Sequence, residues 1–271
     1  MHFQSNSRHL LLALVVAVGA TGQHDTRAQS ALVSSAMSST SFDKWITDKR
    51  KTIASSWYQH PKSEWPKPAT LSDALMQRIK DGRIVSSASV TTVVDTWSEY
   101  EQHNAPAGRA VFPATKKLID DIIVCADDDK AMVAQLYLKK ARLAGLEGND
   151  SDAAVYYERS FKSFDSIHTS IDRNRLESLV GMANALRATG QAKQADTLYL
   201  KALSYPWWKI EGDEEALQEM RSLYIQAGRN LIDIRRNDLQ GLKNIVFIPA
   251  VREDLAPYLQ QRIEEAQEKE K

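Results

Sequence analysis

The segment from Tyr137 to Ala202 contains one pattern of residues twice, with an offset of 42 positions. Each copy has an apolar helical face, then a glycine, then a small residue that is followed four positions later by an aromatic or apolar partner on the same face. A pattern that recurs at a period of this length is typical of helix–turn–helix units that stack along a chain. The matching pairs are Tyr137 and Leu179, Lys140 and Met182, Ala141 and Ala183, Ala144 and Leu186, Gly148 and Gly190, Ala153 and Ala195, Tyr157 and Tyr199, and Ser160 and Ala202.

This pattern resembles the tetratricopeptide repeat family. That family carries a large residue, a pair that ends in a small residue and an aromatic on its first helix, and Ala-x3-aromatic on its second helix. The corresponding stretches here are Lys140-Ala141 and Met182-Ala183 on the first helices, Ala153-x3-Tyr157 and Ala195-x3-Tyr199 on the second, and Pro206 after the second copy. The resemblance implies an all-α fold: a right-handed α-solenoid of antiparallel helix pairs with additional N-terminal helices and a C-terminal capping helix.

The period of 42 residues departs from the family's period of about 34. The additional residues lie between Ser160 and Leu179, in a longer second helix or in a loop. A weaker third copy follows, with Leu217, Met220, Tyr224 and Gly228 on its first helix, whereas Asp233 stands where its second helix should carry a small residue. We therefore expect repeats over residues 127–248 and a polar capping helix over residues 249–271.

Residues 1–22 are predicted to be an export signal. Arg8 and His9 precede an uncharged run from Leu10 to Val18, and small residues follow that run. The run is too short to span a bilayer, which requires about 20 residues, although an uncleaved anchor is the alternative. Residues 23–41 are rich in Ser, Thr, Ala and Gln and are predicted to be a flexible linker. These features predict an exported protein, periplasmic or secreted, with no membrane span once the signal is removed.

Helical spacing begins at Phe42 and continues through residue 126, which predicts an N-terminal helical region over residues 42–126. We expect one helix to end at His60, a second to begin with Thr70 or Ser72 as its cap, and another to begin at Pro113. Residues 90–94 are all β-branched, so a strand is the alternative to a helix there. The tryptophans Trp45, Trp57, Trp65 and Trp97 are predicted to be core residues, with a ligand cleft as the alternative.

Two further features of this part of the chain have structural interpretations. Asp127, Asp128 and Asp129 lack the spacing of a calcium loop and are predicted to cap a helix that starts near Lys130. The single cysteine, Cys125, follows an apolar helical stretch and is predicted to be a buried thiol without a catalytic role.

The composition and the motifs narrow the classes of function. The chain has 35 basic and 35 acidic residues, and this balance gives no electrostatic reason to expect a nucleic acid partner. The metalloprotease, nucleophile-elbow and phosphate-loop motifs do not occur in the sequence, and its histidines are scattered. We therefore expect no catalytic residue, no metal site and no cofactor.

The resemblance implies that the first helices line an inner groove that binds segments of other proteins. The exposed face of these helices carries Lys139 and Arg142 in the first copy, Asn184 and Arg187 in the second and Ser222 in the third, beside Gln135, Glu177 and Gln218. Trp207 and Trp208 either fill the gap between the second and third helix pairs, or are exposed and stack on sugars or anchor a partner.

Three hypotheses follow from the sequence. The first is an exported protein-interaction adaptor of the cell envelope. The second is a helical enzyme or binding protein that acts on a cell-wall or surface polysaccharide. The third is a subunit that mainly self-associates.

Overall fold

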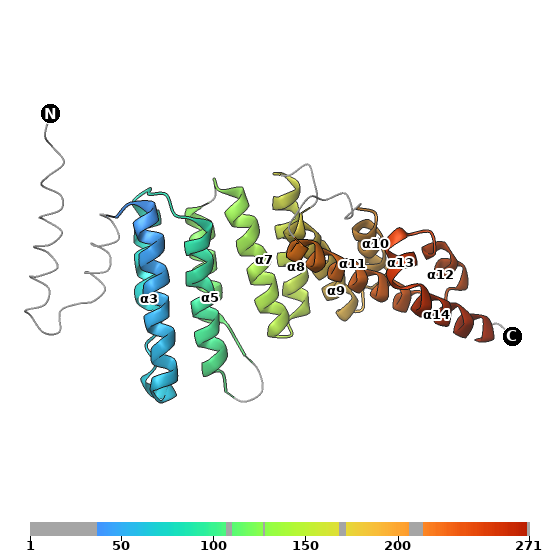
Figure 1. The fold of residues 1–271 in the computed structure, drawn as a ribbon, viewed down its shortest axis with the longest axis horizontal. Coiled ribbons are helices and arrows are strands. Elements are labelled where there is room, and N and C mark those ends of the chain that lie inside the picture. Colours follow the sequence, from blue (N-terminus) through green and yellow to red (C-terminus); the bar gives the residue numbers. More distant parts are fainter. Residues whose placement is uncertain (1–36, 107–109, 127, 168–171, 206–213, 270–271) are drawn as a thin grey trace, which may run out of the picture. The chain divides into compact units, whose positions relative to one another are not determined.

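The computed structural model describes residues 37–106, 110–126, 128–167, 172–205 and 214–269. Within these ranges every regular element is helical, and no strand occurs (Figure 1). The chain divides into two compact units, Met1–Tyr100 and Glu101–Lys271, which are called unit 1 and unit 2 below. The expected boundary between residues 126 and 127 does not coincide with this division. Among the described residues, no helix has both the length and the apolar character that crossing a membrane requires.

Unit 1 contains α3 (Ser39–Gln59), a 3-10 turn η1 (Lys62–Glu64), α4 (Ala69–Lys80) and most of α5 (Ser87–Asn104). The side chain of Ser38 accepts a hydrogen bond from the backbone N–H of Ser41 at 3.2 Å and caps α3. The end of the predicted linker is therefore helical, because a serine at this position satisfies a free N–H of the first turn. The rest of the linker and the predicted export signal lie outside the described residues.

Two expectations for unit 1 have different outcomes. The helix predicted over residues 90–100 is confirmed as part of α5, in which Val90, Val93 and Val94 are buried on one face. The cap predicted for α4 is wrong, because that helix begins after Pro68 and has no side-chain cap. Proline fixes the backbone angle that a first turn needs, so Thr70 and Ser72 fall inside the helix.

Large aromatic rings fill the interior of unit 1. Trp57 is 6% exposed, and its ring centroid lies 5.8 Å from that of Trp65 and 5.9 Å from that of Tyr100. Its indole N–H donates to the carbonyl of Pro66 at 3.2 Å. Trp97 meets Tyr100 edge to face, with centroids 5.9 Å apart. Of the four tryptophans only Trp57 is buried, so the core prediction is confirmed for this residue alone. Trp45, Trp65 and Trp97 are half-buried.

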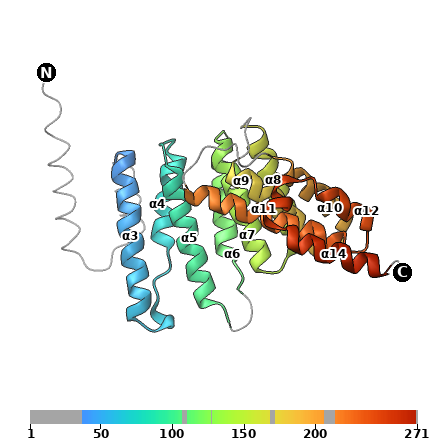
Figure 2. The same cartoon turned by 45° about the vertical axis from the view of Figure 1, so that its right-hand side comes forward.

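Unit 2 contains α6 (Pro113–Cys125), α7 (Lys130–Leu146), α8 (Asp150–Asp165), α9 (Arg173–Ala188), α10 (Ala192–Leu203), α11 (Glu214–Ile234), α12 (Leu239–Ile245), α13 (Pro249–Asp254) and α14 (Ala256–Lys269) (Figure 2). Pro113 begins α6 as predicted, and the carboxylate of Glu101 accepts from the backbone N–H groups of Ala114 and Thr115 at 2.8 and 2.9 Å. Asp129 caps α7 through the N–H of Met132 at 3.0 Å, which confirms the capping prediction.

The repeated segment forms two packed helix pairs, α7 with α8 and α9 with α10, as the sequence predicts. Gly148 and Gly190 end the first helices with φ angles of 67° and 81°, which favour glycine. Ala153 and Ala195 are 1% and 0% exposed on the second helices. The longer period is partly explained by α8, which has 16 residues where α10 has 12.

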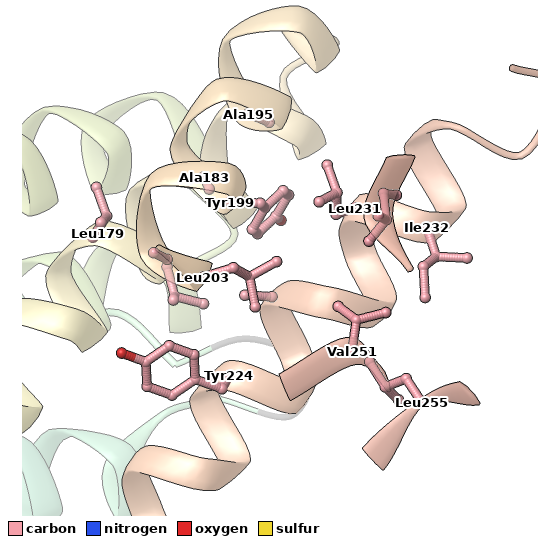
Figure 3. Packing of buried hydrophobic residues seen from close by; sticks show 14 of the residues in the cluster. Leu179, Ala183, Ala195, Tyr199, Leu203, Tyr224, Leu231, Ile232, Val251 and Leu255 are labelled. Atoms are coloured by element: carbon pink, nitrogen blue, oxygen red, sulfur yellow. The ribbon is translucent and has the colours of Figure 1, made fainter. Parts of the chain in front are cut away.

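A close approach between α8 and α9 depends on a glycine. A Cβ atom added to Gly181 would lie 2.4 Å from Cζ of Tyr157, so the ring of Tyr157 occupies the space above the glycine. The largest hydrophobic cluster described in unit 2 contains Tyr199 and Tyr224, which are 0% and 1% exposed (Figure 3). Leu231 belongs to the same cluster, and Figure 3 shows it next to Tyr199.

Three expectations for unit 2 need correction. The second helix of a third repeat, with Asp233 on it, is wrong because α11 continues to Ile234 through Gly228. The region expected to hold one terminal helix contains two, α13 and α14, which meet at Leu255. Cys125 is exposed, because the buried face of α6 ends at Ile122.

Candidate functional site

One groove of about 670 Å³ in unit 2 is lined by residues of three helices, and it is called the α7–α9–α11 groove below. Arg142 comes from the end of α7, and Arg173 and Glu177 come from the first turns of α9. The remaining lining residues all belong to α11: Glu219, Ser222, Leu223, Ile225, Gln226, Arg229 and Asn230. The groove therefore combines the first helices of the two packed pairs with the long helix that follows them.

A chain of ion pairs crosses the groove. The guanidinium of Arg142 donates two hydrogen bonds to the carboxylate of Glu177, at 2.6 and 2.5 Å. Nε of Arg173 lies 2.5 Å from Oε2 of Glu219, and its Nη2 lies 3.9 Å from Oε2 of Glu177. Arg142 and Arg173 remain 38% and 41% exposed, so each pair contributes only about 0–1 kcal/mol to stability. The pairs chiefly fix where the groove's charges lie.

A second polar chain lies next to the groove. The amide oxygen of Asn184 accepts from the hydroxyl of Tyr199 at 2.6 Å and from the side chain of Asn230 at 2.8 Å. Arg187 donates to the amide oxygen of Asn230 at 2.5 Å and lies 3.8 Å from the carboxylate of Asp233. Burial raises the pKa of Tyr199, with Arg187 opposing the shift, so its hydroxyl keeps the proton that it donates.

The predicted partner-binding residues are thus divided by the structure. Arg142 and Ser222 line the α7–α9–α11 groove. Asn184 and Arg187 do not line the groove. Both are hydrogen-bonded to Asn230, which does line it. Lys139 is half-buried on α7 and does not line the groove either. Trp207 and Trp208 lie outside the described residues.

Several lining residues were missed by sequence reasoning, above all Arg173, Arg229 and Asn230. Gln226, Arg229 and Asn230 follow Ser222 at intervals of four, seven and eight residues, the spacing of a single helix face. This spacing is visible in the sequence, and the structure shows that all these residues lie on one helix, because α11 continues beyond Gly228. Arg173 gave no comparable signal, since its place depends on how α9 meets α11.

The groove combines paired charges with polar and apolar side chains. Glu177 and Glu219 are both paired with arginines. Within the described ranges, no group of His, Cys, Asp and Glu side chains is arranged to hold a metal ion. The lining offers arginine, amide and hydroxyl donors beside the apolar side chains of Leu223 and Ile225.

One tryptophan of unit 1 lines a hollow of its own. The half-buried Trp45 lies in a shallow hollow of about 340 Å³ that is lined by residues of α3 alone. The rings of Trp57, Trp65 and Trp97 contact other aromatic rings of unit 1 or its backbone carbonyls.

No protein-family model matches the chain. No curated protein matches it either.

Proposed function

We propose that this protein is an exported, tetratricopeptide-repeat-like adaptor of the cell envelope that binds a segment of a partner protein in the α7–α9–α11 groove. The observation that carries the proposal is the convergence of residues from three helices, α7, α9 and α11, on one groove. The repeat with its 42-residue offset supports the solenoid part of the proposal, and residues 1–22 support export.

The size and lining of the groove suit a peptide segment. Sites of roughly 300–1,000 Å³ hold ligands of drug size, so a groove of about 670 Å³ accommodates a few consecutive residues. Leu223 and Ile225 offer apolar contact, while Gln226 and Arg229 offer donors for backbone carbonyls or polar side chains. A flexible segment of a partner would thereby find both kinds of contact on neighbouring turns of α11.

The test is site-specific photo-crosslinking in envelope extract, with a photoreactive phenylalanine analogue at Ser222. This residue lines the groove, and its hydroxyl bonds only to the carbonyl of Gln218 within its own helix, at 3.0 Å. The matched control is the same analogue at Thr197 on α10, which is also exposed and bonds to a carbonyl of its own helix at 3.2 Å. The hydroxyl of each residue thus bonds within its own helix.

We expect position 222 to crosslink one recurrent peptide of a partner protein, identified by mass spectrometry, and position 197 not to do so. A Ser222→Trp substitution should compete with the segment and abolish the capture of that partner, whereas Thr197→Trp should not. Equal crosslinking from both positions would show that the groove has no special role in binding.

A further inference from the structure

The positive charge of the α7–α9–α11 groove is unevenly distributed. Three arginines and two glutamates line it, which leaves a net charge of one positive unit. Arg142 and Arg173 are engaged by Glu177 and Glu219, as described above. Arg229 is exposed on α11 and has no ion pair with any described residue. The excess positive charge is therefore located at Arg229.

The surroundings of Arg229 add further donors. The side-chain amide of the neighbouring Asn230 has two N–H bonds, and one of them donates to Asn184 at 2.8 Å. Gln226, one turn before Asn230, lines the same groove. The negative charges of the two lining carboxylates, Glu177 and Glu219, are compensated by their ion pairs with Arg142 and Arg173. A ligand group that meets this surface should thus be an acceptor with negative charge.

We infer that the segment bound in the groove carries an acidic side chain that pairs with Arg229, and that Arg229 determines this specificity. The inference rests on the proposed function. A guanidinium binds a carboxylate through two parallel N–H···O bonds, and a hydrogen bond between charged groups is worth more than one between neutral groups. Arg142 and Arg173 contribute less to the binding of this side chain, because it would have to displace Glu177 or Glu219.

The experiment measures fluorescence anisotropy of labelled peptide pools with the full chain. Each pool has randomised apolar and polar flanks, is blocked at both termini, and has a fixed central residue: Glu in one pool, Gln in a second and Lys in a third. Blocked termini ensure that only side-chain charges differ. We expect the Glu pool to bind most tightly and the Lys pool most weakly.

Two substitutions in the groove should change affinity in opposite directions. Arg229→Gln should weaken the Glu pool by about tenfold or more and leave the Gln pool unchanged. Glu219→Gln should strengthen the Glu pool, because it releases Arg173. The matched control is Arg236→Gln, since Arg236 is also exposed, follows α11 in the chain and does not line the groove. It should leave all three affinities unchanged.

The outcomes separate the two proposals. If the wild-type chain binds no pool, both the groove's role and the acidic specificity are overturned. If it binds all three pools equally, or if Arg229→Gln binds the Glu pool as tightly as the wild type, the groove still binds peptides but Arg229 does not select an acidic side chain.

Discussion

The regular elements described in unit 1 and unit 2 are all helical, but different side chains lie between the helices of the two units. In unit 1, the rings of Trp57, Trp65 and Tyr100 fill the space between elements. In unit 2, helices of the repeated pairs approach at small residues, where Ala183 and Ala195 are fully buried. The first kind of packing uses ring contacts that occur once, whereas the second kind recurs with a fixed spacing.

This difference explains why only unit 2 contains a visible repeat. A small residue sets how closely two helices approach, so the same residue is required wherever the same approach recurs. A ring contact such as that between Trp57 and Trp65 depends on one particular turn, here η1. It does not require that the same residues recur later in the sequence. The differences between the units can be tested by perturbing each kind of packing.

Alkaline pH should have the largest effect and should act on unit 2. Burial raises the pKa values of Tyr157, Tyr199 and Tyr224 above the usual value of 10.0. Above pH 10 the unfolded chain loses phenolic protons that the native chain retains, so the stability present below pH 10 falls as pH rises. Each phenol contributes up to about 1.4 kcal/mol per pH unit until its native pKa is reached. The free energy of unfolding in urea should fall as the pH rises above 10, and Tyr224→Phe should reduce this fall; an unchanged pH dependence would contradict the assignment.

Trp57→Ala should cause the next largest effect, and it should act on unit 1. Truncation of a buried tryptophan leaves a cavity and typically costs about 3–5 kcal/mol. The measurement is the free energy of amide hydrogen exchange in α3 and α4, with α9 as an internal reference. Trp45→Ala is the control, because Trp45 is only half-buried and should matter less. Equal losses for both variants would mean that the ring cluster around Trp57 does not hold unit 1 together.

Ala195→Leu tests the packing at small residues in unit 2. Ala195 is 0% exposed, so additional carbon atoms have no space, and we expect a loss of about 1–3 kcal/mol in urea unfolding. Ala192→Leu, at the exposed start of the same helix, is the matched control and should change stability by less than about 0.5 kcal/mol. If both variants are as stable as the wild type, close approach at Ala195 does not limit the packing of α10.

Arg142→Gln and Arg187→Gln should have the smallest effect. Their side chains are 38% and 39% exposed, and exposed ion pairs contribute about 0–1 kcal/mol. Arg78 of unit 1 is 3% exposed and donates to the carbonyls of Met37 and Ile84 at 3.0 and 3.1 Å. Arg78→Gln should therefore cost more, about 1.5–3 kcal/mol for each bond lost. Thermal unfolding that ranks these variants in the reverse order would refute the argument from exposure.

Much of the helical structure could be predicted from local patterns. The spacing of Val90, Val93 and Val94 indicated a helix despite their β-branched side chains, and the cap at Asp129 followed from the residues around it. The turns at Gly148 and Gly190 were visible because glycine tolerates positive φ angles. Such features depend on residues that are near one another in the sequence.

The groove was predicted only in part, because its geometry depends on distant residues. The bond between Arg142 and Glu177 joins residues that are 35 positions apart, and both side chains had looked like free surface groups. Arg229 was overlooked because Gly228 was matched to a repeat that ends there, whereas α11 continues to Ile234. Periodicity showed which face of a helix is polar, but it did not show which polar groups would neutralise one another.

The ends of α7 and α9 share a backbone geometry that bears on how such a chain evolves. Besides the similar φ angles of Gly148 and Gly190, the N–H of Asn149 bonds to the carbonyl of Ala144 at 2.9 Å, and the N–H of Gln191 bonds to that of Leu186 at 2.8 Å. These bonds are displaced by the same 42 positions as the sequence pattern. Recombination between the two glycine codons would insert or remove one 42-residue repeat and leave an unaltered turn at the junction. The number of repeats can therefore change during evolution without a new connecting turn.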